Sequence, residues 1–269
     1  MRLWGLYFAV ATSSFRRYAT YRVATAAGVF TNTVFGFILA CTFTALWSQR
    51  PHLGGYDQAQ ALTFVWTGQA MLAAAALIGG GFQEELQERI RTGDVVVDLY
   101  RPVDLQLWWL TADLGRAGFH LLGRGIVPVI VGASFFELAL PASPLVWLAF
   151  LVSVTLGVVA GFALRYLFAL SAFWLLDGAG VNTLSTLLSI FFSGMLLPLT
   201  VFPGGFGEAV RWLPWAATMQ VPADVLLGEY PGAEVLSAFG FQATWAVLLL
   251  AAGRLLQSLA TRKVVVQGG

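Results

Sequence analysis

The sequence predicts an all-α membrane protein, and two observations carry this prediction: the composition and the length of the apolar segments. Of the 269 residues, 58% are hydrophobic and only 11% are charged, and the mean hydropathy is +0.76. Soluble domains carry about 25% charged residues, so a chain this apolar needs lipid around much of its surface. The apolar segments are long and recur along the whole chain, which favours a polytopic helical protein.

The apolar segments predict six membrane spans. A spanning helix needs about 20 apolar residues, because it must cross a hydrocarbon core about 30 Å thick. An even number of spans places both termini on the same side, and residues 1–269 are expected to form a single domain. The expected spans are Val23–Trp47, Ala61–Gly81, Gly115–Leu138, Pro144–Leu175, Val181–Phe202 and Val235–Leu259.

Residues 1–22 predict a helix that lies along the membrane surface and leads into the first span. Ala9-Val10-Ala11 resembles a signal-peptide cleavage site, but cleavage there would leave a segment shorter than the usual length of about 15–30 residues. Residues 15–22 instead mix aromatic side chains with arginines, which is typical of a helix in the headgroup region. We therefore expect this helix to be retained.

The basic residues predict the orientation of the chain. With the N-terminus inside, the outer side receives only Arg50 and Arg211, and the other arginines and the single lysine fall on the inner side or near the inner ends of spans. This distribution follows the positive-inside rule. Both termini and the charged segment 82–113 are therefore expected in the cytoplasm.

Residues 82–113 form a charged loop in an otherwise apolar chain. The first half is expected to be helical, because Glu85 and Arg89 have the i,i+4 spacing that stabilises a helix. Thr92-Gly93-Asp94 interrupts it, and residues 95–100 supply an apolar patch. A short amphipathic element with charge around an apolar patch is what docking into a groove of a soluble partner requires.

The alternative for this loop is a solvated segment whose charges only keep it soluble. The apolar side chains of residues 95–109 favour docking, because they need to be covered. The candidate docking residues are Glu84, Glu85, Glu88, Arg89, Arg91, Asp94, Asp98, Arg101, Pro102 and Asp104.

Residues 203–232 predict a re-entrant hairpin on the outer side. Prolines and glycines divide this stretch into apolar pieces of about 8–14 residues, which are too short to span. Trp212 and Trp215 would anchor the hairpin at the interface. The alternative is an ordinary outer loop with a surface helix.

Several function classes are disfavoured by what the sequence lacks. It has no G-x-x-x-x-G-K-[ST] motif and its only lysine is Lys263, so we expect no ATP site and no bound cofactor. His52 and His120 fall on opposite sides of the membrane, which argues against a metal cluster. The expected spans have no carboxylate near the bilayer centre, as a proton-driven carrier commonly has. We therefore expect neither an enzyme nor a nucleic-acid-binding protein. We expect a partner protein to supply the energy.

Basic side chains on the third span form a stripe in the inner-leaflet half. Arg116, His120 and Arg124 have i, i+4 and i+8 spacing, and Arg165 on the fourth span is expected at a similar depth. Charged residues inside a membrane commonly face a bundle interior or a wet cavity, so these four could contact an anionic headgroup or an acidic substrate. The alternative is that they snorkel to the interface or pair with Asp113 and Asp177.

The whole chain resembles the membrane subunit of a bacterial ABC exporter of the type-2 class. The most specific part is residues 88–94 followed by Leu99-Tyr100-Arg101-Pro102, which resembles the I-R-x-G-x … L-x-R-P loop of one branch of these permeases. That branch combines two different permeases with one ATPase and includes drug, antibiotic and viologen exporters. The surface helix, the six spans and the outer hairpin also have counterparts in the family.

The resemblance implies a role for each segment. Residues 1–22 would be the elbow helix, residues 82–113 would contain the coupling helix that binds the ATPase, and residues 203–232 would be the outer re-entrant hairpin. The implied partners are two copies of an ABC ATPase that binds ATP and Mg, membrane lipid, and a second permease, for which a paralogue is favoured over a second copy.

The expected function is ATP-driven export of an amphipathic or hydrophobic compound through a dimeric path in the bacterial inner membrane. A membrane subunit that recruits or regulates a cytoplasmic protein without a transport path is the alternative.

Overall fold

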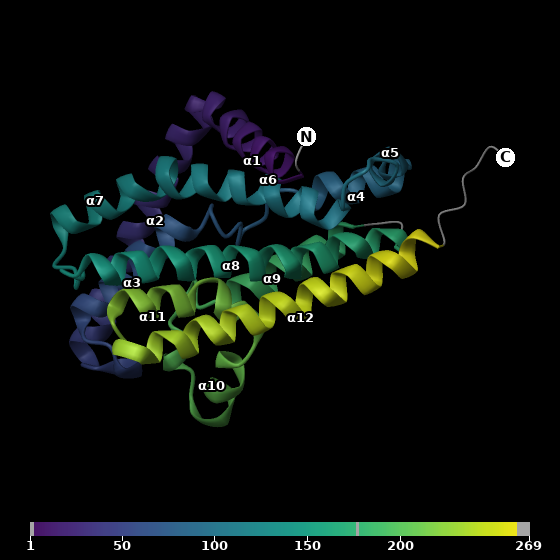
Figure 1. The fold of residues 1–269 in the computed structure, drawn as a ribbon. Helices are drawn as coiled ribbons and strands as arrows, with labels where there is room; N and C mark the ends of the chain where they lie inside the picture. The colour runs from purple at the N-terminus through teal and green to yellow at the C-terminus, as the bar shows by residue number, and fades with distance from the viewer. Residues whose placement is uncertain (1–2, 176–177, 263–269) are drawn as a thin grey trace.

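The computed structural model describes residues 3–175 and 178–262, and the regular elements within these two ranges are all helical (Figure 1). The predicted all-α class is therefore confirmed for the described residues. The elements are α1 (Leu3–Thr20), α2 (Arg22–Gln49), η1 (Leu53–Gly55), α3 (Gln58–Met71), α4 (Gln83–Thr92), α5 (Val95–Leu99), α6 (Leu105–His120), η2 (Leu121–Gly125), α7 (Ile126–Phe135), α8 (Pro144–Leu170), η3 (Ser171–Phe173), α9 (Ala179–Phe192), η4 (Leu199–Val201), α10 (Gly204–Arg211), η5 (Pro214–Thr218), α11 (Gln220–Leu227), η6 (Gly232–Glu234) and α12 (Val235–Thr261).

Four helical segments in the described part of the chain are long and apolar enough to cross a membrane. They have 28 to 31 residues each. At a rise of about 1.5 Å per residue, each exceeds the hydrocarbon thickness of about 30 Å. These segments correspond to the first, third, fourth and sixth predicted spans and are Arg22–Gln49, Leu105–Phe135, Pro144–Phe173 and Gly232–Thr261. The third begins at Leu105 instead of the predicted Gly115, so the end of the predicted loop 82–113 belongs to this helix.

The continuous helices expected over Ala61–Gly81 and Val181–Phe202 are not what the structure shows. The helices in these ranges, α3 and α9, have 14 residues each, about 21 Å. After α3 the chain passes through turns in which Ala76 and Gly79–Gly81 have positive φ. After α9 the chain leaves the helix near Gly194, at φ 90. Left-handed glycines commonly end helices, which accounts for the end of α9. α3 already ends at Met71, and the positive-φ residues from Ala76 to Gly81 keep the chain after it from resuming a helix.

The third long helix contains a π-helical turn, η2, between α6 and α7. Pro128 follows this turn in α7. Proline has no backbone N–H, and its ring crowds the carbonyl four residues earlier, here that of Arg124. The helix therefore widens at Arg124, and π-turns of this kind often occur at functional positions.

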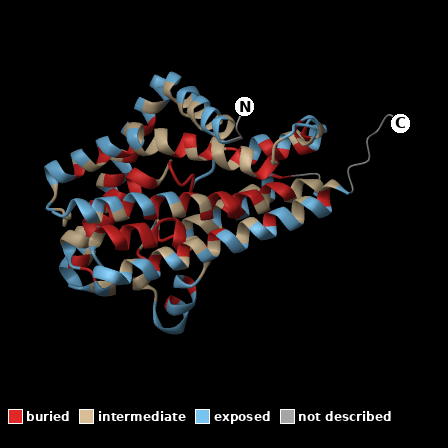
Figure 2. Cartoon of the chain, viewed as in Figure 1, coloured by how far each residue is buried: buried red, intermediate tan, exposed pale blue. Residues whose placement is uncertain are grey.

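The core lies where α3, α8 and α11 meet, and Figure 2 shows buried residues there and mainly exposed or intermediate residues on α1 and α12. α12 packs along α8. The buried Gln242 amide joins α12 to its neighbours, since Nε2 donates to the Ala217 carbonyl at 2.8 Å and to the Ser153 carbonyl at 3.0 Å. A satisfied polar group in an apolar core holds the helices in one register.

The segment predicted as a hairpin forms α10, η5 and α11. α10 projects from the body of the molecule (Figure 1), whereas residues 220–226 of α11 are all buried. The start of α1, α4, α5 and the end of α12 lie in one half of the molecule, and the end of α7 and the start of α8 lie in the other half (Figure 1).

Candidate functional site

The first half of the charged loop folds as α4, whose two faces differ sharply. Leu86 and Ile90 are buried in a cluster with Phe82 and residues of α8. Glu84, Glu88 and Arg91 fall at i, i+4 and i+7 and are exposed. Gly93 ends the helix with φ 85, the left-handed conformation that glycine adopts at little cost. α4 therefore presents a charged face outward while its apolar face is fixed to the bundle.

Asp98 holds this loop together through ion pairs with two arginines. It is only 4% exposed, and Arg89 donates to both of its oxygens, with Nε at 2.5 Å and Nη2 at 3.0 Å. Arg101 Nη1 lies 3.2 Å from Asp98 Oδ1. The hydrogen bond to Asp98 raises the pKa of Arg89. A bidentate guanidinium–carboxylate pair has a fixed geometry, so α5 is held rigidly against α4.

Two apolar side chains stand on the outer surface of this rigid loop. Val97 is 58% exposed and Tyr100 is 80% exposed. Val95, from the same predicted patch, is buried in the core behind them. The apolar patch available to a partner is therefore Val97 and Tyr100, with Glu88, Arg91 and the exposed Pro102 nearby in the loop.

Other predicted docking residues make contacts within the chain. Asp104 caps α6 by accepting from the Leu107 amide at 2.8 Å, and it lies 3.4 Å from Arg254 of α12. Glu85 lies 3.7 Å from Arg17 of α1. In a further contact, Thr92 Oγ1 donates to Asp94 at 3.0 Å. These contacts position the loop. Glu84, Glu88 and Arg91 are exposed, and the last two pair with each other, with Arg91 Nη1 3.4 Å from Glu88 Oε2.

Gln83 and Gln87 connect α4 to the bundle by hydrogen bonds. Gln83 Nε2 donates to Asn182 Oδ1 of α9 at 2.7 Å, and Ser185 Oγ donates to Gln83 Oε1 at 3.4 Å. Gln87 Nε2 donates to the Phe168 carbonyl of α8 at 3.4 Å. Sequence reasoning missed these residues. Their only signal was their periodicity with Leu86 and Ile90 on the buried face of the predicted helix.

A buried ion cluster lies where α6 meets α8. Asp113 Oδ1 accepts from Arg116 Nε and Asp113 Oδ2 accepts from Arg165 Nη2, each at 2.7 Å. Arg116 also donates to the carbonyls of Ala73 and Ala74, at 2.5 and 2.8 Å. The irregular segment after α3 is thus held by a guanidinium instead of by helical hydrogen bonds.

The four predicted inner basic residues therefore divide into two pairs. Arg116 and Arg165 pair with Asp113, as one of the two interpretations expected. His120 and Arg124 line a cavity that Arg116 also lines. The other expected partner, Asp177, lies outside the described residues.

A second polar cluster ties α11 to the segment between α2 and α3. Tyr56 donates its hydroxyl proton to Asp224. Gln220 Nε2 donates to the Tyr56 hydroxyl at 2.8 Å and to Asp224 at 2.9 Å. The backbone N–H of Gln220 donates to the Ser193 carbonyl at the end of α9, at 2.9 Å. α9 is therefore hydrogen-bonded to α4 at one end and to α11 at the other.

Four long apolar helices in the described part of the chain, with a charged loop packed on one of them, are the architecture of a multi-pass membrane protein. The chain belongs to the ABC-2 family of transporters: the family model described as ABC-2 family transporter protein matches residues 30–268. Membrane subunits of this family are typically non-catalytic and generally pair with an ATPase. A search of curated proteins finds no match to the chain.

Proposed function

We propose that this chain is the transmembrane subunit of an ATP-driven exporter and that α4 and α5 bind a separate ATPase. The observation that carries the proposal is the rigid loop with Val97 and Tyr100 exposed beside the charged face of α4. An exposed apolar patch with a charged rim fits a groove on a soluble partner. ATP and Mg would be bound by that partner.

α4 is placed to transmit a movement of the ATPase to the spans. It packs on α8 through Leu86 and Ile90 and is hydrogen-bonded to α9 through Gln83. A displacement of α4 would therefore move the inner ends of α8 and α9 together. Only the part of the binding energy that differs between the ATPase states can drive such a switch.

A second permease would complete the path, and a paralogue is favoured over a second copy. α2 exposes Phe30, Phe35 and Ile38, and α9 exposes Leu184 and Phe191. These uncovered apolar faces suit a second protomer with lipid around it. Because the faces are apolar, the exported compound would be amphipathic or hydrophobic. We also propose that the chain belongs to the branch of the family that combines two different permeases with one ATPase.

The proposed membrane is a bacterial inner membrane, with both termini in the cytoplasm. The grouping of the start of α1, α4, α5 and the end of α12 in one half of the molecule supports this orientation (Figure 1), as does the distribution of arginines. α1 would lie in the inner headgroup region as the elbow helix. The segment 203–232 would enter from the outer side, with the buried α11 as its membrane-embedded arm.

Replacing Tyr100 by alanine should weaken ATPase binding about 30-fold, because a central aromatic anchor contributes about 2 kcal/mol to an interface. The side chain is 80% exposed, so the fold should be unaffected.

Charge reversal at Glu88 or Arg91 should uncouple ATP hydrolysis from transport. Binding of the purified ATPase to the permease in nanodiscs, and ATP hydrolysed per solute moved, measure the two effects.

The matched control is Glu234→Arg, since Glu234 is also exposed but precedes α12 in the other half of the molecule. It should leave binding and coupling unchanged. Normal ATPase affinity in Tyr100→Ala together with normal coupling in Glu88→Arg and Arg91→Glu would contradict the docking role of this loop.

Replacing Gln83 by leucine should lower transport per ATP hydrolysed while ATPase binding stays near normal. The change removes the hydrogen bond to Asn182 and leaves the outer face of α4 intact. A buried hydrogen bond contributes about 1 kcal/mol, so the loss of coupling should be several-fold. Vesicle flux and ATP hydrolysis measured on the same sample would show it. Equal loss of flux and of ATPase binding would argue against a transmitting role.

Reconstitution with the co-purifying ATPase separates the exporter from a recruitment or regulatory subunit. Substrate-stimulated ATP hydrolysis together with solute flux supports the exporter. Stable ATPase binding with no flux for any amphipathic probe favours the alternative.

A further inference from the structure

A cavity of about 500 Å³ lies between α1, α2 and the α6–η2 helix. Arg116, His120 and Arg124 line it on one side. The backbone of Gly79–Gly81 lines it on another, and a Cβ atom added to Gly80 would meet no atom within 4 Å. The absence of side chains there leaves room for a ligand to approach the main chain.

Three buried nitrogen atoms around this cavity have no hydrogen-bond partner among the described residues: Arg165 Nη1, Arg124 Nε and His120 Nδ1. Arg165 is only 4% exposed. Its Nη1 faces the glycine wall, since a Cβ atom on Gly81 would lie 2.9 Å from it. Buried polar groups are normally satisfied, and unsatisfied ones that gather around one cavity indicate a ligand that would accept their hydrogen bonds.

The side chains around the cavity carry more positive than negative charge, which also favours an anionic ligand. Arg116 and Arg165 share the single carboxylate of Asp113, and Arg124 has no ion pair in the described part of the chain. The exposed Glu84 lies near the rim, with Oε1 4.0 Å from a Cβ atom built on Gly79. Three guanidinium groups thus face one buried and one peripheral carboxylate. Arginines match the oxygens of phosphate especially well.

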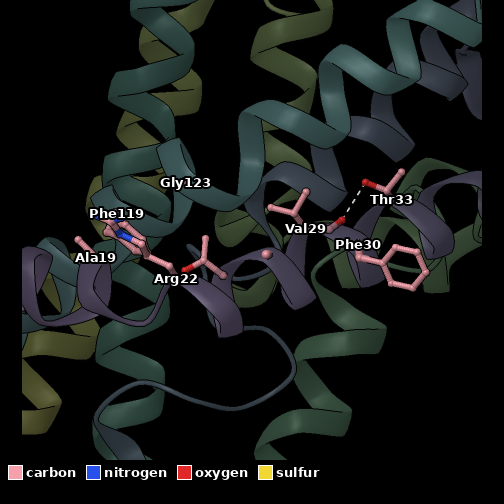
Figure 3. A pocket seen from close by; sticks show the side chains of 9 residues that line it. Ala19, Arg22, Val29, Phe30, Thr33, Phe119 and Gly123 are labelled. Carbon is pink, nitrogen blue, oxygen red and sulfur yellow. Dashed lines mark hydrogen bonds between the residues drawn. The ribbon is translucent and has the colours of Figure 1, made fainter.

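An apolar depression of about 670 Å³ lies beside the cavity. Its lining includes Ala19, Val29, Phe30 and Phe119, and Thr25 lines both the depression and the cavity. Figure 3 shows Ala19 and Phe119 at one end and Phe30 at the other. A cationic cavity next to an apolar depression fits a molecule with an anionic head and an apolar tail.

We propose that the cavity binds the phosphate of an anionic phospholipid from the inner leaflet, with an acyl chain in the apolar depression. Arg124 and His120 would contact the phosphate directly, and Arg165 would donate from behind the glycine wall. The placement in the inner leaflet rests on the proposed function, because it requires α1 to lie at the cytoplasmic surface. The charge and cavity arguments do not depend on that placement.

The test is native mass spectrometry of the purified full-length chain, titrated with phosphatidylglycerol, with phosphatidylcholine and with inorganic phosphate. Wild type should bind phosphatidylglycerol in preference to phosphatidylcholine. Arg124→Gln should weaken phosphatidylglycerol binding about tenfold, because it removes a charge-assisted hydrogen bond. Arg124 has no hydrogen bond in the described part of the chain to lose, so this variant should fold.

Gly28→Ala provides a second variant that keeps every charge. A Cβ atom at Gly28 would lie 2.2 Å from the Arg124 guanidinium, so the side chain must leave its present position. This variant should also weaken phosphatidylglycerol binding. Arg254→Gln, on the exposed side of α12, is the matched control and should bind as wild type does.

Each other result overturns the proposal. Equal binding by wild type, Arg124→Gln and Gly28→Ala would remove the site. Equal weakening in Arg254→Gln would show general attraction to a basic surface. Saturation by inorganic phosphate alone would assign a soluble anion instead of a lipid. Since no ATPase is present in these titrations, a failure here is distinct from a failure of the docking experiment with Tyr100→Ala.

Discussion

Replacing Asp113 by asparagine should lower the free energy of unfolding by about 3–5 kcal/mol, because it leaves buried guanidinium groups without their counter-ion. The Asp113 side chain is fully buried and is shared by Arg116 and Arg165, each at 2.7 Å. Asparagine has nearly the same shape, so the loss would come from charge and hydrogen bonding and not from a cavity. Thermal and denaturant unfolding in detergent, monitored by tryptophan fluorescence, would measure it.

Asp57→Asn is the matched control for this prediction. Asp57 is exposed and caps α3 by accepting from the Gln60 amide at 2.8 Å, and asparagine caps helices about as well as aspartate. It should therefore change stability by less than about 0.5 kcal/mol.

In addition, Arg165→Met should be less destabilising in the Asp113→Asn background than in wild type, because it removes an unpaired cation. Additive effects of the two changes would contradict the ion-cluster interpretation.

Replacing Gly115 by alanine should displace α1 from α6. A Cβ atom at this position would lie 2.1 Å from the Ala11 carbonyl oxygen, whereas ordinary contacts begin at 3.4 Å. The obstacle is backbone, so no side chain can rotate away and the two helices must separate. We expect the free energy of unfolding to fall by about 1–3 kcal/mol, as for other overpacked contacts. Coupling should fall as well, because α1 contacts the loop through Arg17 and Glu85.

Gly118→Ala is a nearly identical change on the same helix with the opposite expectation. A Cβ atom there would lie 3.9 Å from Phe15 Cδ2, an ordinary contact. The substitution should be neutral or stabilising by up to about 1 kcal/mol, since alanine favours helix more than glycine does. Unfolding curves of the two variants, measured side by side, test the close approach of α1. Similar stability in both would show that α1 does not pack on α6 in this way.

The sequence alone determined the class of the protein and the approximate position of its four long helices, although the third begins at Leu105 instead of Gly115. Both follow from properties summed over about 20 residues, and such sums are insensitive to any one contact. The sequence also determined that α4 has a charged face, because helical periodicity places Glu84, Glu88 and Arg91 together without reference to the rest of the fold. The family resemblance rested on residues of the same loop.

The lengths of α3 and α9 were harder to predict, because glycine is common in membrane helices as well as at helix ends. Gly79–Gly81 could have continued a span. In the structure α3 already ends at Met71, and the carbonyls of Ala73 and Ala74 beyond it are hydrogen-bonded to Arg116 instead. A helix boundary of this kind depends on a partner from another helix.

Only the tertiary structure decided which charges face outward and which pair inside. Arg165 is 52 residues from Asp113, and Gln83 is 99 residues from Asn182. Sequence separation contains no information on such distances, so Arg89, Asp98 and Asp104 looked as available for docking as Glu88. Packing of α4, α6, α8 and α9 against one another buries some of these side chains and leaves others exposed. That selection leaves only some of the ten candidate docking residues exposed, and it places Arg124 in a cavity without an ion pair among the described residues.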